Sequence, residues 1–301
     1  MSDRIHYTHC PVCGSSELAS VFSVVDQLVS RESFLILSCT TCGCRLTEQA
    51  PDQAGSAVYY QSAAYISHSN TRQGLINRLY QAVRKRTLRQ KVNWVERSTG
   101  LRTGRVLDIG SGTGAFVHEL RRAGWQADGL EPDPLARQVA QTDFGESLLD
   151  IDRLFQLPTG SFDAITLWHV LEHVHDLTGY MNQLHQLLKP GGRLLIALPN
   201  YTSLDAAHFG NWWAAYDVPR HLYHFSPSSI RHLAEKHRFS CCSIRPLWYD
   251  AFYIALLSNQ HKTGSNRWVQ SAYIGILSNL KALLNAEKGS SLLYELKPVI
   301  D

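Results

Sequence analysis

The sequence contains no apolar run that approaches the length of a membrane-spanning helix, and its start, MSDRIHYTHC, has no hydrophobic signal segment. We therefore expect no transmembrane segment, and the cytoplasm is the default location. Charged residues make up only 18% of the chain and the formal net charge is +3. This charge is too mild for a strongly basic nucleic-acid-binding face. With 44% hydrophobic residues and no repeats, the composition is that of a globular protein.

Cysteine is absent between Cys44 and Cys241, while five cysteines lie within the first 44 residues. A large intracellular chain seldom uses such a set for disulfides, so metal binding is considered first. The segments CPVCG at 10–14 and CTTCG at 39–43 are two C-x-x-C-G turns. Two thiolates on one tight turn can converge at about 2.3 Å from a zinc ion, and four of them close its coordination shell.

The sequence therefore predicts one structural zinc ion bound by four cysteines, namely Cys10, Cys13, Cys39 and Cys42. The glycine after each second cysteine permits a positive φ, which lets backbone amides point at sulfur. A redox pair or unligated thiols are the alternatives. Cys44 falls outside the predicted shell, and Cys241 and Cys242 are most simply explained as packing residues.

The chain is expected to divide into four segments. Residues 1–50 form a zinc-ribbon-like module, 51–100 a helical lid or linker, 101–245 the core, and 246–301 an extension of helices and a strand. Within the core, strand-like and helical stretches alternate in the order RVLDIG, AFVHELRRAG, QADGLEP, PLARQVAQ, FDAITLW, YMNQLHQLLK and RLLIALP. This alternation predicts an α/β fold in which helices wrap a parallel sheet.

The strongest functional signal is RVLDIGSGTG at 105–114, where an apolar strand meets a glycine-rich turn before a helix. Gly110, Gly112 and Gly114 allow a tight turn and let a ligand lie against bare backbone. The spacing G-x-G-x-G is one residue short of the dinucleotide fingerprint, which disfavours nicotinamide cofactors. Glu131, at the end of the next strand, can accept hydrogen bonds from both ribose hydroxyls of a nucleoside. A glycine turn in an unrelated α/β protein is the alternative.

Four stretches, VLDIGSGTG, GLEPD, FDAITLWHVLEHV and LKPGGRLLIALPN, resemble in this order the motifs of class I S-adenosylmethionine-dependent methyltransferases. The resemblance covers about residues 100–200. It implies a Rossmann-like, doubly wound sheet of seven strands whose last strand is antiparallel. It also implies a set of cofactor-binding residues: Asp108, Gly110, Ser111, Gly112 and Gly114 in the methionine-side loop, Glu131 on the ribose, Ile151 and Asp152 at the adenine, and Trp168 and His169 bordering the cofactor. For His169, His173 and His175 the alternative is a helix face at the surface.

Polar side chains crowd into YDVPRHLYHFS at 216–226, which follows the stretch RLLIALPN. In a doubly wound fold this segment emerges at the carboxyl edge of the sheet, where ligands bind. We expect His221 to be a general base or to orient the acceptor, since histidine titrates near neutral pH. Tyr216 is a further candidate, and Arg220 could bind an anionic group. The alternative is that the histidines only anchor the loop.

An N-terminal zinc-binding module before this core resembles the sugar C-methyltransferases, which act on nucleotide-linked keto-deoxysugars. Their Y-x-E-H-x-x-Y-F-S-like stretch corresponds to PRHLYHFS, with His221 matching and Arg220 in place of glutamate. The whole chain also resembles a largely uncharacterised bacterial methyltransferase group, through YYQSAAYISHS and DAFYIALLSNQHK. There Tyr60, Tyr65 and His68 are candidates for a lid over the cofactor, with aromatic packing as the alternative.

The leading hypothesis is therefore a methyltransferase that acts on a small molecule or an intermediate of sugar or glycan biosynthesis. An RNA- or macromolecule-modifying enzyme that uses the zinc ribbon for recognition is the main alternative. A non-catalytic adapter and a peripheral-membrane enzyme are weaker ones. Few basic residues in the module argue against nucleic acid as a partner. The basic run RKRTLRQK at 84–91 is expected to be one solvated face of a helix. The sequence contains no signal of an oligomeric state.

Overall fold

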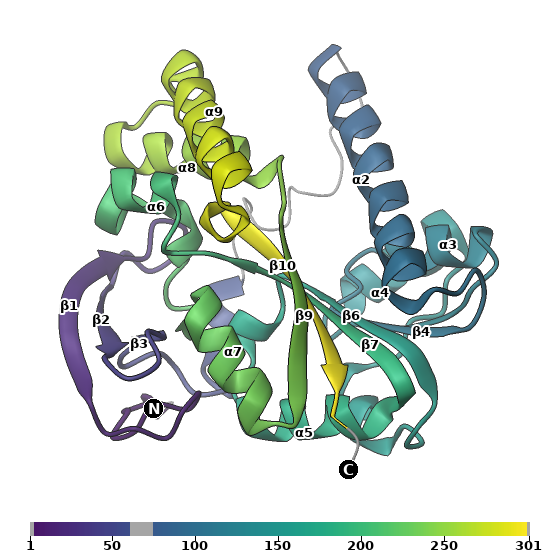
Figure 1. Ribbon diagram of the computed structural model, residues 1–301. Coiled ribbons are helices and arrows are strands. Elements are labelled where there is room, and N and C mark those ends of the chain that lie inside the picture. The colour runs from purple at the N-terminus through teal and green to yellow at the C-terminus, as the bar shows by residue number, and fades with distance from the viewer. Residues whose placement is uncertain (1–2, 61–74, 300–301) are drawn as a thin grey trace.

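A computed structural model describes residues 3–60 and 75–299 of the chain (Figure 1). Two sheets organise this part: a large sheet in the order β5-β4-β6-β7-β10-β9 and a small one in the order β1-β2-β3-β8. The strands of the large sheet are β4 (Arg105–Ile109), β5 (Gln126–Leu130), β6 (Phe162–Trp168), β7 (Leu188–Pro199), β9 (Phe239–Pro246) and β10 (Ser291–Pro298). Those of the small sheet are β1 (Leu18–Val25), β2 (Ser33–Cys39), β3 (Arg45–Thr47) and β8 (Tyr223–His224).

Both faces of the large sheet are covered, as its strand sequences require. Along β4, Val106 packs in one hydrophobic cluster while Leu107 and Ile109 pack in another, because successive side chains point to opposite faces. One face is covered by α2 (Leu75–Thr99) and α3 (Ala115–Arg122), and the other by α5 (Leu177–Leu187) and α7 (Pro227–Lys236). The doubly wound α/β fold expected from the sequence is confirmed.

The described sheet has six strands, where the family resemblance implied seven. The missing strand is reduced to an isolated parallel bridge between Leu130 and Leu149, beside β5. At the other edge, β10 lies between β7 and β9 and runs antiparallel to both. The last strand in the chain is thus antiparallel, as expected.

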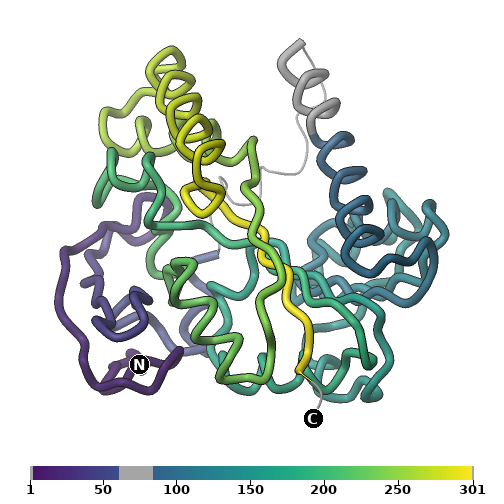
Figure 2. Tube along the Cα trace, in the orientation of Figure 1, coloured from purple at the N-terminus to yellow at the C-terminus, as the bar shows by residue number. Residues whose placement is uncertain are grey.

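Further helices and short turns lie between the strands in chain order. They are α4 (Pro134–Phe144), α6 (Leu204–Phe209), α8 (Asp250–Thr263) and α9 (Trp268–Leu284), with short 3-10 turns η1 (Ser56–Tyr60), η3 (Ile151–Gln156), η4 (Leu171–His173), η5 (Gly210–Trp212), η6 (Ala214–Tyr216) and η7 (Ala286–Lys288). In the tube view, α2 stands apart from the pair α8–α9 above the sheet (Figure 2). Among the described residues, no helix combines the length and apolarity that crossing a bilayer requires.

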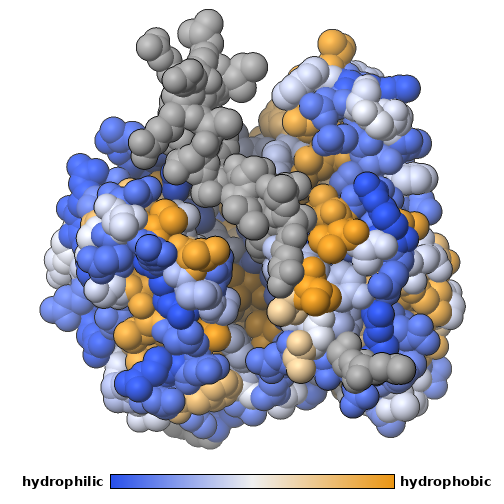
Figure 3. All heavy atoms as spheres, turned by 180° about the vertical axis from the view of Figure 1, so that it is seen from behind, coloured by the Kyte–Doolittle hydropathy of each residue, from blue (hydrophilic) through white to orange (hydrophobic). Residues whose placement is uncertain are grey.

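Helix α9 leaves much of its apolar surface exposed. Val269, Leu283 and Leu284 are 87%, 68% and 86% exposed. The face opposite to that of Figure 1 shows hydrophobic side chains gathered where α8 and α9 lie (Figure 3).

Two elements cross the segment boundaries that the sequence suggested. The two-residue strand β8 belongs to the core by sequence, yet it pairs with β3 of the cysteine-bearing module, His224 opposite Arg45. Strand β10 comes from the C-terminal extension, yet it lies inside the core sheet. The four-segment division stays a prediction, which limited proteolysis can test.

Candidate cofactor and acceptor site

The glycine loop has the backbone that its sequence predicts. Gly110, Gly112 and Gly114 have φ values of 70°, 52° and 74°, in the left-handed region that favours glycine. A Cβ on Gly110 would lie 2.4 Å from Val170 Cγ2, and one on Gly114 would lie 2.8 Å from Ala140 Cβ. A Cβ on Gly112 would meet no atom within 4 Å. Two glycines thus permit close packing, and Gly112 leaves open space at the loop.

The two acids of the loop region are both buried. Asp108 is 1% exposed and its Oδ1 accepts a 2.6 Å hydrogen bond from Thr166 Oγ1. Burial raises the pKa of Asp108 to about 6. Glu131, at the end of β5, accepts hydrogen bonds from the amides of Gly112 at 2.7 Å and Asp133 at 3.0 Å. The carboxylate of Glu131 therefore holds the glycine loop against the second strand.

A cavity of about 370 Å³ opens between the glycine loop and α2. Its lining residues are Arg84, Thr87, Leu88, Lys91, Asp108, Gly110, Ser111, Gly112, Thr113, Ala115, Phe116 and Trp168. Lys91 Nζ lies 4.2 Å from the centre of the Trp168 ring, and Arg84 donates to Thr113 Oγ1 at 3.3 Å. One wall thus carries cations and the other carries Asp108, an arrangement that can bind a zwitterionic amino-acid group.

Sequence reasoning missed Lys91 and Arg84, because it assigned RKRTLRQK to a solvated face. The residues of this run do not all lie on one face of the helix. One side of α2 carries those with the spacing i, i+3, i+4 and i+7, namely Arg84, Thr87, Leu88 and Lys91. That side faces the cavity. The i, i+3, i+4 and i+7 spacing of these residues was the signal in the sequence that could have predicted them.

Lys91 is expected to bind the cofactor only while protonated. Burial lowers its pKa to about 8, although Asp108 and Asp250 act in the opposite direction. Affinity for the cofactor carboxylate should therefore be full below pH 8 and fall above it. Titration calorimetry with S-adenosylhomocysteine from pH 6.5 to 9.5 should show this fall in the wild type and a weaker one in Lys91→Arg, which stays charged. Identical profiles for both proteins would contradict this role.

Trp168 borders this cavity, while five other candidates for cofactor binding are not among the residues that line it, namely Gly114, Glu131, Ile151, Asp152 and His169. Ile151 is half-buried and Asp152 is exposed, both on η3. His169 bridges two carboxylates, with Nε2 3.2 Å from Asp250 Oδ2 and Nδ1 3.6 Å from Glu172 Oε1. Burial opposes a charge on His169, but the two carboxylates outweigh it and raise its pKa to about 10. The assignments of these residues to the cofactor stay predictions.

Tyr216 and Arg220 are buried at the junction with the small sheet. The Tyr216 hydroxyl accepts a hydrogen bond from Arg45, and its ring packs edge-on against Phe22. Each nitrogen of the Arg220 guanidinium donates to a protein group: to Asp217, to Asp26 at 3.0 Å and to the Tyr59 carbonyl at 3.0 Å. Arg220 was expected to bind an anion of the substrate, yet in the structure these internal partners engage it. The sequence could not foresee this, because Asp26 lies far away along the chain.

His221 lies in a cluster with Glu172 and His173. Its Nδ1 is 2.9 Å from the Ala215 carbonyl, and its Nε2 is 3.9 Å from Glu172 Oε1. The rings of His173 and His221 meet edge-on with centroids 4.6 Å apart. Burial, together with the neighbouring His221, lowers the pKa of His173 to about 4. Glu172 and His173 belong to the LEHV stretch after β6, which was the available signal for them.

The other polar residues of this segment anchor it. His224 Nε2 lies 3.0 Å from Thr47 Oγ1 in β3, as expected if this histidine ties the loop. Of the three lid candidates, Tyr60 has its hydroxyl 3.1 Å from His173 Nδ1. Tyr65 and His68 lie outside the described residues.

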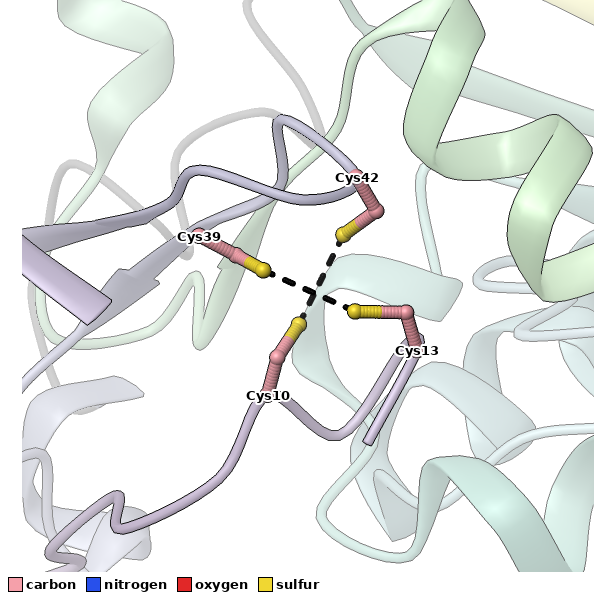
Figure 4. A group of neighbouring side chains, drawn as sticks. All are labelled: Cys10, Cys13, Cys39 and Cys42. Atoms are coloured by element: carbon pink, nitrogen blue, oxygen red, sulfur yellow. Dashed lines mark hydrogen bonds between the residues drawn. The ribbon is translucent and has the colours of Figure 1, made fainter. Parts of the chain in front are cut away.

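The four predicted zinc ligands converge on one point (Figure 4). The Sγ atoms of Cys10 and Cys42 are 3.6 Å apart, and those of Cys13 and Cys39 are 3.5 Å apart. Thiolates at 2.3 Å from a tetrahedral zinc ion would be about 3.8 Å apart, so the donor set fits this metal. Cys44 is fully buried and lies outside the group of four.

A second cavity, of about 860 Å³, lies between α2 and the helices α8 and α9. Four cations and four aromatic rings line it, together with three amides: Lys85, Arg86, Arg89, Arg97, Trp94, Trp248, Tyr249, Phe252, Gln90, Asn93 and Asn279. No carboxylate is among these residues. Trp94 stacks on Trp168 of the first cavity with centroids 6.0 Å apart, so this pair of rings lies between the two cavities. The cavity therefore suits an anionic molecule with an apolar or ring-shaped part.

The comparison with protein families gives one match, and it covers more than half of the chain. The sequence model of a family described as a methyltransferase domain matches residues 78–244. This range contains the glycine loop, Glu131, Trp168 and His221. Lys91 of the cofactor cavity also lies within it.

Similar curated proteins are methyltransferases as well. The ubiquinone biosynthesis O-methyltransferase of Xanthomonas oryzae pv. oryzae is 33% identical over 144 residues, which are 45% of this chain and 60% of that protein. The demethylmenaquinone methyltransferase of Tropheryma whipplei is 26% identical over 249 residues, which are 77% of this chain and 100% of that protein. The chain thus spans less than two thirds of the first relative.

Solved structures agree in fold. Magnesium protoporphyrin IX methyltransferase from Synechocystis PCC 6803 aligns with a TM-score of 0.53 at 16% identity, covering 81% of this chain and 99% of that one. A SAM-dependent methyltransferase from Archaeoglobus fulgidus aligns with a TM-score of 0.50 at 17% identity, covering 78% of this chain and 100% of that one. The family match leads to one assignment, with which the solved structures agree in fold: the chain belongs to the methyltransferase domain family.

Proposed function

We propose that this protein transfers the methyl group of S-adenosylmethionine, in line, to a small-molecule acceptor that carries an anionic group. The observation that carries the proposal is the cavity under the glycine loop, which joins Asp108, Lys91 and Trp168 in a chain of the methyltransferase family. When bound there, S-adenosylmethionine supplies an electrophilic methyl group on a sulfonium. The residues of the chain bind and orient both reactants and exclude water.

Each part of the cofactor has a matching group. Asp108 would accept hydrogen bonds from the ammonium group, and Lys91 with Arg84 would pair with the carboxylate. Glu131 would accept hydrogen bonds from the ribose hydroxyls, because its carboxylate has more lone pairs than the loop amides occupy. The apolar faces of Trp168 and Phe116 would lie against the cofactor.

Two observations support a small, anionic acceptor. The relatives above are named for ubiquinone biosynthesis and for demethylmenaquinone, which are small-molecule chemistries. The second cavity adds four cations and no carboxylate next to the cofactor cavity. A nucleotide-linked sugar is the acceptor that the sugar C-methyltransferase resemblance implies. Its phosphates would pair with the cations of this cavity, and its rings would pack against Trp248 and Tyr249. On this acceptor side, His221 would take up a proton or orient the reacting group.

We also propose that the four clustered cysteines bind one structural zinc ion. Its role would be to hold the small sheet, which contacts the acceptor segment directly. Strand β3 pairs with β8, and the Gly43 carbonyl accepts hydrogen bonds from Tyr201 and Ser226. A closed shell of four thiolates leaves no position for substrate.

The test of this function is methyl transfer from labelled S-adenosylmethionine in a fractionated bacterial extract. Label should enter a small-molecule or sugar-nucleotide fraction, and Arg86→Ala/Arg89→Ala should raise the acceptor KM at least about tenfold, or roughly 1.4 kcal/mol. The matched control is Lys281→Ala/Lys297→Ala, which removes two exposed charges outside the cavity. His221→Ala, after a folding check, should lower kcat with little change in cofactor affinity.

Transfer of label to RNA, DNA or protein would contradict the small-molecule acceptor. In that case the zinc module and the basic cavity would form a recognition surface for a macromolecule. Nuclease treatment of the extract before the assay separates these outcomes. Steep loss of transfer with rising salt would point to nucleic acid as well.

A further inference from the structure

Glu172 is a buried carboxylate with no hydrogen bond to the described residues. It lies on η4, four residues after Trp168, and is 1% exposed. Neither of its oxygens has a hydrogen-bond partner within the part of the chain that the structure describes. The nearest cationic candidate, His169 Nδ1, is 3.6 Å away, which is too far for a hydrogen bond. His169, which lies between Glu172 and Asp250, compensates part of the buried charge but leaves both oxygens of Glu172 without a hydrogen bond from it.

Two histidines beside Glu172 each place Nδ1 near a backbone carbonyl. His221 Nδ1 is 2.9 Å from the Ala215 carbonyl, and His173 Nδ1 is 3.0 Å from the Arg220 carbonyl. A carbonyl only accepts hydrogen bonds, so Nδ1 carries the hydrogen in His221 and its Nε2 keeps a lone pair in the neutral ring. In His173 the Tyr60 hydroxyl also lies 3.1 Å from Nδ1, and the same tautomer results when this hydroxyl accepts. A histidine that binds a metal through one nitrogen typically donates from the other to a carbonyl in this manner.

The side chains of the cluster lie close together. One ligand atom from each of Glu172, His173 and His221 lies within 4.8 Å of the others, and His221 Nε2 is 3.9 Å from Glu172 Oε1. Ligands of one ion at about 2.1 Å lie roughly 3 to 4 Å apart, so small side-chain movements would complete the set. Asp217 is not free to join it, because Arg220 binds its carboxylate.

We propose that Glu172, His173 and His221 form a second metal site, which binds a divalent first-row transition metal such as Mn²⁺, Fe²⁺ or Zn²⁺. Two imidazoles and one carboxylate are the ligand set that these ions share, and they leave coordination positions open for an exogenous ligand. The site differs from the four-cysteine cluster in chemistry and in place. It follows the carboxyl end of β6, the edge at which Trp168 lines the cofactor cavity.

The consequence for catalysis rests on the proposed function. A cation held here would bind a hydroxyl or enol oxygen of the acceptor and lower its pKa, so that the proton leaves to solvent. His221 would then orient the acceptor through the cation, and its Nε2 would not act as a base. This arrangement predicts that chelators abolish methyl transfer without releasing the cofactor.

The test is the binding of Mn²⁺ to the zinc-containing protein, followed by electron paramagnetic resonance. Mn²⁺ prefers oxygen and nitrogen ligands, so zinc thiolates do not compete for it. We expect one equivalent of bound Mn²⁺, with affinity lowered more than about 100-fold in Glu172→Gln and His221→Gln, beyond the 10–100-fold effect of losing an outer partner. Glu235→Gln and His208→Gln, which change exposed residues, are the matched controls.

Binding that Glu172→Gln leaves unchanged would overturn the site, as would the absence of binding for Mn²⁺, Co²⁺ and Zn²⁺ beyond the zinc of the cysteines. If the variants do not fold, pulsed spectra of Mn²⁺ on the wild type decide, since coordinated imidazole gives ¹⁴N modulation and its absence excludes the histidines. Mn²⁺ binding is measured without any acceptor. A failed methyl-transfer assay with intact Mn²⁺ binding would therefore count against the proposed function alone.

Discussion

Cys39→Ser is expected to lower the melting temperature by roughly 10 °C. Loss of a structural metal is among the changes that cost more than about 4 kcal/mol, and each kcal/mol corresponds to roughly 2–4 °C in a domain of this size. The Cys39 thiol lies 3.5 Å from that of Cys13, inside the group of four. Thermal unfolding followed by circular dichroism, together with zinc content by mass spectrometry, measures both the loss of stability and the loss of metal.

The control for this experiment is Cys242→Ser, which removes an exposed thiol in β9. Its melting temperature and zinc content should equal those of the wild type. The small sheet holds the acceptor segment through β3 and β8, so Cys39→Ser should also lose methyl transfer while the cofactor cavity still binds S-adenosylhomocysteine. A Cys39→Ser protein with unchanged zinc content and melting temperature would show that the cluster is not a metal site.

Gly112→Ala is expected to weaken cofactor binding at least about 100-fold, or roughly 2.7 kcal/mol. Two effects add. A residue with a Cβ is strained at φ 52°, and the new methyl group occupies the open space that lines the cofactor cavity. Titration calorimetry with S-adenosylhomocysteine gives the change in affinity, and thermal unfolding gives the change in stability.

Gly160→Ala separates these two effects. Gly160 has φ 61° and, like Gly112, meets no atom within 4 Å of a built Cβ, but it lies outside the cofactor cavity. Both variants should lose about 1–2 kcal/mol of stability from left-handed strain. Only Gly112→Ala should lose the cofactor. Equal affinities in the two variants would mean that the loop does not contact the ligand.

The local elements of this protein follow from its sequence alone. The strands Arg105–Ile109 and Phe162–Trp168 and the glycine turn between strand and helix agree with the patterns RVLDIG, FDAITLW and GSGTG. Hydrophobic periodicity and glycine conformation are properties of neighbouring residues, so they can be predicted without the fold. The same holds for the two C-x-x-C-G turns, because each brings its own pair of thiols together.

Contacts between distant segments were decided only by the tertiary structure. Arg220 pairs with Asp26, and Lys91 lines the same cofactor cavity as Asp108. Glu172 and His221 lie on different segments, yet they share one buried cluster. Sequence periodicity does not predict such long-range contacts, because they depend on how α2, the small sheet and the acceptor segment pack on the core.

The sequence by itself determined the family, the glycine loop and the cysteine ligand set, because these reside in short contiguous motifs. The tertiary structure decided the roles at the acceptor side. It engaged Arg220 in internal ion pairs, turned one face of a basic helix toward the cofactor cavity, and left Glu172 buried beside His173 and His221. Burial and orientation set the charge and reactivity of these groups, and both arise only when the chain packs.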